Sequence, residues 1–69
     1  MSPLPIVLRA RKCVADAETT VCRQEITITR LLVAGLSTSR ADVMLVEMNE
    51  QLQIFRDRLV ELETLYPGD

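Results

Sequence analysis

The chain has no histidine and no tryptophan, and its 69 residues include one phenylalanine, one tyrosine, two glycines and two cysteines. Histidine is the commonest general base and the commonest metal ligand in proteins, so its absence argues against the usual catalytic and metal sites. A chain this short also offers no glycine-rich phosphate loop and no cleft for a nucleophile and its base. We therefore expect a protein that is not an enzyme and has no cofactor, metal site or small-molecule substrate.

The charge balance is close to neutral, with 8 basic and 10 acidic side chains and a net charge of −2. Such a chain has no strongly basic field to hold nucleic acid. No apolar run approaches the roughly 20 residues of a membrane span, and the first basic residues follow a short apolar run instead of preceding it, unlike a signal peptide. Apolar residues still make up 48% of the chain, too many for a disordered segment. These features predict a folded, cytoplasmic protein with no membrane partner.

The two cysteines, Cys13 and Cys22, are nine positions apart. At about 100° per residue, this spacing places them on opposite sides of a helix, which excludes a disulfide within that helix. Two cysteines without histidine also fall short of the four ligands of a structural zinc site. We expect both to be reduced and to pack as small side chains.

Two segments with a seven-residue apolar repeat dominate the sequence. Alternating spacings of three and four residues are typical of the contact line of a coiled coil, which is called the seam below. The seam predicted in the first segment is Val7, Ala10, Val14, Ala17, Val21, Gln24, Ile28 and Leu31. In the second segment it is Leu45, Met48, Leu52, Phe55, Leu59, Leu62 and Tyr66.

The segment between the two repeats predicts a turn. Gly35 can end a helix in the left-handed conformation without a Cβ penalty, Ser37, Thr38 and Ser39 can each cap the next helix, and Ser39 with Asp42 resembles a capping box. We predict one all-α domain over residues 1–69, an antiparallel two-helix hairpin like a coiled coil. Its helices are expected at about 5–34 and 39–66, with the turn at 35–38.

The charges and the small side chains predict a register for this hairpin. Residues 1–41 carry six basic and three acidic side chains, a net charge of +3, whereas residues 42–69 carry two basic and seven acidic ones, a net charge of −5. Folding at the turn is expected to bring residues near 10 opposite residues near 64, and residues near 17 opposite residues near 57. Ala10 and Ala17 would then face bulky seam residues.

A single hairpin buries only one stripe on each helix, which is little for a chain of this size. The first helix carries a second apolar stripe, called the outer stripe below, made of Leu8, Ala15, Cys22, Ile26 and Val33. Val46 and Val60 flank the seam of the second helix. An exposed apolar surface of this extent is typical of an interface. We predict that these residues pair two hairpins into a four-helix bundle, with a different protein partner as the alternative.

The middle of the chain carries a recognisable pattern. Arg23-Gln24, Ile28, Arg30-Leu31, Gly35, Thr38 and Arg40-Ala41 fit R-Q-x3-I-x-R-L-x3-G-x2-T-x-R-A, and Asp57-Arg58-Leu59 and Glu61-Leu62 follow. This pattern resembles short, uncharacterised proteobacterial proteins in which a leucine-rich helix ends in a D-R-x-L run. The chain departs from it at Leu36-Ser37, at Cys22 and in its proline-rich start. The resemblance implies a cytoplasmic helical hairpin of unknown function and assigns no catalytic or binding residue.

Two functional hypotheses follow. The first is a small non-catalytic module for oligomerisation or protein interaction, in which Gln24, a polar residue inside the seam, either specifies the register or reaches water at its edge. The second is a small regulator that binds nucleic acid through a basic strip on the first helix, formed by Arg9, Arg11, Lys12, Arg23 and Arg30.

Overall fold

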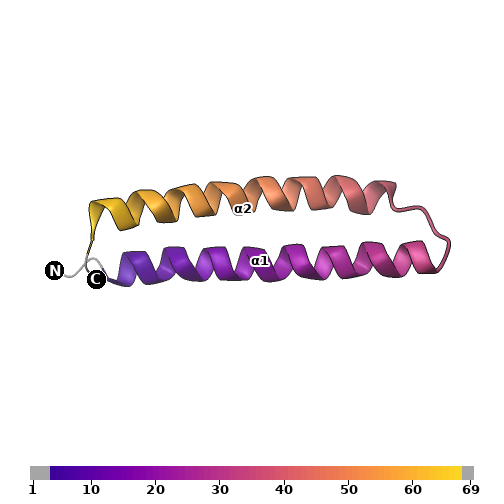
Figure 1. Cartoon of the computed structure of the whole chain (residues 1–69), viewed down its shortest axis with the longest axis horizontal. Coiled ribbons are helices and arrows are strands. Elements are labelled where there is room, and N and C mark those ends of the chain that lie inside the picture. The colour runs from indigo at the N-terminus through magenta and orange to yellow at the C-terminus, as the bar shows by residue number, and fades with distance from the viewer. Residues whose placement is uncertain (1–3, 68–69) are drawn as a thin grey trace.

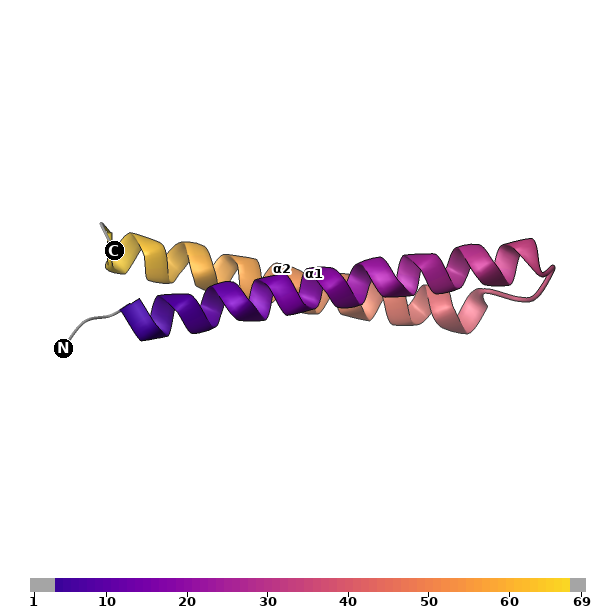
Figure 2. The same cartoon turned by 90° about the horizontal axis from the view of Figure 1, so that it is seen from below.

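The computed structural model describes residues 4–67, so the ends of the predicted domain, residues 1–3 and 68–69, lie outside it. Two helices, α1 (Leu4–Val33) and α2 (Ser39–Leu65), run antiparallel and lie side by side along their lengths (Figure 1). They cross at a shallow angle (Figure 2). The described chain contains no strand. The predicted all-α antiparallel hairpin is confirmed.

The molecule is a rod of 54 × 14 × 14 Å. Its radius of gyration of 15.9 Å compares with about 11 Å for a compact domain of this length. Each helix therefore has a single neighbour along its whole length, and most of its circumference faces solvent.

Threonine side chains fit into α1 by bonding to the helix backbone. The hydroxyls of Thr27 and Thr29 donate to the carbonyl oxygens of Arg23 and Glu25, each at 3.0 Å. Bonds of this kind satisfy the hydroxyl inside a helix, where β-branched residues are otherwise disfavoured. The local alternation of isoleucine and threonine at residues 26–29 therefore lies within α1.

Gly35 ends α1, as the sequence predicts. It has a positive φ of 72°, and its N–H donates to the carbonyl of Leu32 while the N–H of Leu36 donates to that of Leu31. These two bonds form a Schellman motif, which satisfies the last carbonyl groups of the helix. A Cβ at Gly35 would contact nothing within 4 Å. The backbone angle, and not crowding, therefore accounts for glycine at this position.

The start of α2 differs from the predicted capping box. Thr38, not Ser39, is the N-cap residue, and its hydroxyl donates to the Asp42 carboxylate at 2.9 Å instead of accepting a backbone N–H. Asp42 lies in the first turn of α2, where the helix dipole stabilises negative charge. Asp42 is thus paired with Thr38 and not with Ser39, the partner expected from the sequence.

The seam forms the core of the hairpin. The seam residues Val7, Val14 and Leu52 are buried, as is Ala41 in the first turn of α2, with exposed fractions between 1% and 9%. The other seam side chains are half-buried, except for exposed Tyr66; they are Ala10, Ala17, Val21, Gln24, Ile28, Leu31, Leu45, Met48, Phe55, Leu59 and Leu62. A seam that is mostly half-buried shows how little a single partner helix can cover.

The register of the backbone differs from the prediction. Ala17 lines a hollow with Met48, Gln51 and Phe55, whereas it was expected opposite residues near 57. Gln24 likewise reaches Ala41, because the chain doubles back after Gly35 and α2 begins short of the tip of α1 (Figure 1). Ala10 and Ala17 nevertheless lie beside the bulky Phe55, so small side chains still meet large ones.

Candidate functional site

The hairpin has two unlike faces, one on either side of the seam. On the first, called the ion-paired face, Arg11 donates to Glu63 at 3.0 Å and Arg56 lies 3.6 Å from Glu18. These pairs join residues that the predicted register places opposite one another, although the backbone register is shifted. The reason is that long side chains lean towards the N-terminus of their own helix and so reach along the antiparallel neighbour. The two pairs bridge α1 and α2 at about half exposure.

The opposite side, called the groove face, is hollowed. Two adjoining hollows of about 340 and 330 Å³ share Cys13 and Phe55 as lining residues. On α1, Cys13 and Thr20 follow Arg11 and Glu18 by two positions, which places them about 200° away around the helix. The two faces therefore lie on opposite flanks of the same seam.

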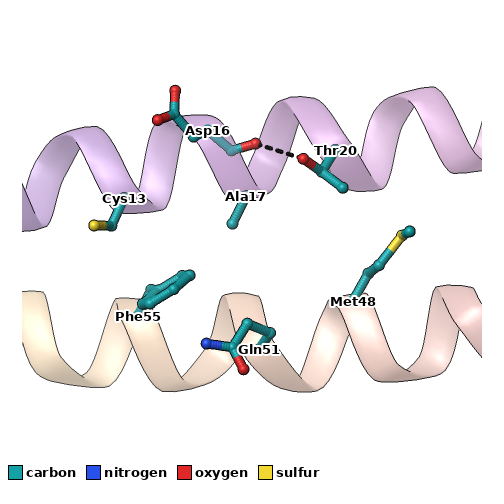
Figure 3. A pocket seen from close by; sticks show the side chains of 7 residues that line it. All are labelled: Cys13, Asp16, Ala17, Thr20, Met48, Gln51 and Phe55. Atoms are coloured by element: carbon teal, nitrogen blue, oxygen red, sulfur yellow. Dashed lines mark hydrogen bonds between the residues drawn. The ribbon is translucent and has the colours of Figure 1, made fainter.

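The groove is lined by small and apolar side chains from both helices, together with three charged side chains and one amide. Its full lining is Ile6, Arg9, Ala10, Cys13, Asp16, Ala17, Thr20, Met48, Gln51, Phe55, Arg58 and Leu62. Figure 3 shows the Phe55 ring and the Met48 side chain pointing towards α1, while the Asp16 carboxylate points away. The Thr20 hydroxyl is satisfied by the Asp16 carbonyl at 3.0 Å. In this part of the groove, apolar side chains therefore point inward and the Asp16 carboxylate lies outside.

The predicted interface residues are all exposed. Leu8, Ile26, Val33, Val46 and Val60 show between 47% and 85% of their surface, and Ala15 and Cys22 are also exposed. Neither Ile26, at 47% exposed, nor Val33, at 85%, belongs to the buried core.

The two cysteines have different environments. Both are free thiols, but Cys13 is half-buried in the groove whereas Cys22 is exposed on α1. Cys13 packs as predicted. For Cys22 the prediction of a packed side chain is wrong in this hairpin, because the position lies in the outer stripe, which α2 does not reach.

Gln24 makes a specific contact between the helices. Its side-chain amide donates to the carbonyl oxygen of Ala41 at 2.9 Å, and the residue is half-buried. The bond ties the seam of α1 to the first turn of α2, which is consistent with the role in register. The alternative, a side chain that only reaches water, does not describe this contact.

The basic residues of α1 do not form an uninterrupted strip. Arg11 is paired with Glu63, and Lys12 lies 3.5 Å from Asp16. Arg9 is at the rim of the groove. Part of the positive charge on which the nucleic-acid hypothesis depends is thus neutralised within the hairpin.

The described residues 4–67 lack the features of two other kinds of site. They contain no cluster of three or more potential metal-ligating side chains, and neither of their helices combines the length and apolarity of a membrane-spanning segment. No family model, curated protein or solved structure matches the chain. The resemblance to short proteobacterial hairpin proteins therefore stays a prediction.

The groove face was missed in the sequence because its residues do not form a continuous apolar stripe. Ile6, Thr20 and Gln51 line it, yet two of these are polar. The sequence does contain one indication of the groove face, which is the difference between the two sides of the seam on the first helix. Arg11 and Glu18 are charged on one side, whereas Cys13 and Thr20 on the other side are small and uncharged.

Proposed function

We propose that this chain is a non-catalytic helical module that acts through protein–protein contact, and that two hairpins pair into a four-helix bundle. The support is an imbalance between buried and exposed apolar side chains. Among the described residues, four hydrophobic side chains are buried whereas thirteen large ones are exposed. A water-soluble chain with so much apolar surface is typically completed by an interface.

The surface area supports the same proposal. The chain exposes 5368 Å², whereas a compact monomer of its mass exposes about 4,400 Å². The difference of about 1,000 Å² is similar to the roughly 800 Å² that each partner buries in a standard protein–protein interface. One further hairpin is therefore enough to bring the exposed surface to a normal value.

The proposal is tested by the mass of the chain in solution. Sedimentation equilibrium over a range of micromolar concentrations is expected to show a species with twice the 7.8 kDa mass of the chain, and circular dichroism at the same concentrations reports helix content. A helical species that stays at 7.8 kDa throughout the range would overturn self-association.

A further inference from the structure

We propose that the groove face is the surface on which a second copy of this chain docks, with α1 of one hairpin against α2 of the other. This inference rests on the proposed function, and goes beyond it by choosing one of the two faces and one arrangement of the pair. It also replaces the outer stripe as the centre of the predicted interface.

The chemistry of the two faces favours the groove. Covering the ion-paired face would remove Arg11, Glu63, Glu18 and Arg56 from water, and the cost of desolvating charges offsets much of their attraction. On the groove face, described residues form no ion pair between α1 and α2. Apart from Arg9, Asp16 and Arg58, docking there covers uncharged side chains.

The shape of the groove favours a helical partner. Ala10, Cys13 and Ala17 are small residues along the α1 wall, and small side chains let another helix approach closely. Phe55 and Met48 are only half-buried by their own hairpin, so each has surface left for a second contact. Ile6, at the open end of the groove, is 51% exposed and offers a large side chain to the partner.

The charge of the helices favours a second copy as the partner. Residues 4–33 carry five basic and three acidic side chains, a net charge of +2, and residues 39–65 carry three basic and six acidic ones, a net charge of −3. A two-fold axis parallel to the helices places the basic helix of each hairpin against the acidic helix of the other. The two helices are thus complementary in net charge, as a symmetric pairing of α1 with α2 requires, although Arg9 and Arg58 at one end of the groove are like charges that this pairing brings to the same height.

The two native cysteines report on the two sides of α1 in the unmodified protein. A maleimide pulse at rising protein concentration, followed by site-resolved mass spectrometry, measures the labelling rate of each thiol. Labelling of Cys13 is expected to slow about tenfold once about nine-tenths of the chains are dimeric, since only the monomer exposes it. Cys22 is the internal control, and its rate is expected to change less than about twofold.

The outcomes separate this inference from the proposed function. Protection of Cys22 without protection of Cys13, in a sample whose mass is that of a dimer, overturns the groove face and leaves self-association standing. A chain that is monomeric at every concentration removes both. Protection of Cys13 alone supports the groove face.

The arrangement of the two hairpins has its own readout in sedimentation equilibrium at different salt concentrations. Opposite charges attract across this interface, so raising the ionic strength to about 1 M, where charges are screened within about 3 Å, is expected to weaken the dimer. An arrangement with α1 against α1 brings two basic helices together, and its dimer would tighten with salt. Tightening therefore overturns the proposed pairing of α1 with α2.

Discussion

The two faces of the hairpin share one seam and differ in what flanks it. On the ion-paired face, the flanking positions carry Arg11, Glu18, Arg56 and Glu63, which bridge the helices. On the groove face, α1 contributes the uncharged Ile6, Cys13 and Thr20 beside the seam, no ion pair of the described residues bridges the helices, and the seam residue Phe55 stays half-exposed. The same apolar repeat thus produces one face whose flanking charges are paired within the hairpin and one that no ion pair between the helices covers.

The largest loss of stability is expected from a substitution in the buried seam, which lies between the two faces. Leu52 is 4% exposed in the seam, and its replacement by alanine should destabilise the fold by about 2–5 kcal/mol. Chemical denaturation followed by circular dichroism measures the loss. Ile54→Ala is the matched control, because Ile54 is 57% exposed and on the same helix. Equal losses of stability in the two variants would contradict the assignment of Leu52 to the buried seam.

A matched pair of substitutions compares the two faces directly. Ile6 and Leu8 are 51% and 50% exposed, but Ile6 lines the groove beside Arg9 and Arg58 whereas Leu8 belongs to the outer stripe. Ile6→Lys should weaken the dimer by about tenfold or more, since burying an unpaired charge costs at least about 1–3 kcal/mol. Leu8→Lys should leave it within about twofold. Sedimentation equilibrium measures the dimer affinity of both variants. A larger loss of affinity for Leu8→Lys than for Ile6→Lys would refute the groove face as the dimer interface.

A substitution of Gln24 tests how the register between the two helices is specified. Gln24→Leu replaces the hydrogen bond to Ala41 with apolar contact in the seam. We expect the free energy of unfolding to rise by about 1 kcal/mol, while the population becomes mixed in mass because the polar specifier is gone. Circular dichroism and light scattering follow the two effects. A variant with unchanged melting temperature and unchanged mass would show that the bond has no role.

The smallest effect is expected on the ion-paired face. A double-mutant cycle with Arg11→Ala and Glu63→Ala should give a coupling energy of about 0.2–1 kcal/mol, because the pair is half-exposed and screened by water. Denaturation of the four proteins in the cycle measures it. A coupling well above this range would mean that the face contributes more to the fold than its exposure suggests.

Much of the fold could be predicted from residue spacing. The repeat from Leu45 to Leu62 identified the side of α2 that packs against α1, and Gly35 identified the end of α1. Both follow from local rules, because helical periodicity and a left-handed residue depend on near neighbours in sequence. These rules hold whatever the two helices do relative to one another.

The register and the groove could not be predicted in the same way. The path of the chain from Leu36 to Thr38 decides where α2 begins, and several paths suit the same turn sequence. Once α2 starts short of the tip of α1, Gln24 of the seam meets Ala41 in the first turn of α2. Contacts between distant residues depend on that path, so spacing alone leaves them open.

The chain reversal at Gly35 leaves Leu4 and Leu65 at the same pole of the rod (Figure 1). In a pair of hairpins that point the same way, four helix ends gather at this pole and both turns occupy the other. Fluorescent dyes or protein cargo joined to any of these ends would be held close together, whereas an insertion at the turn would be carried to the far tip. Such a pair would thus bring together whatever is joined to the helix ends and would keep it a full rod length away from whatever is inserted at the turns.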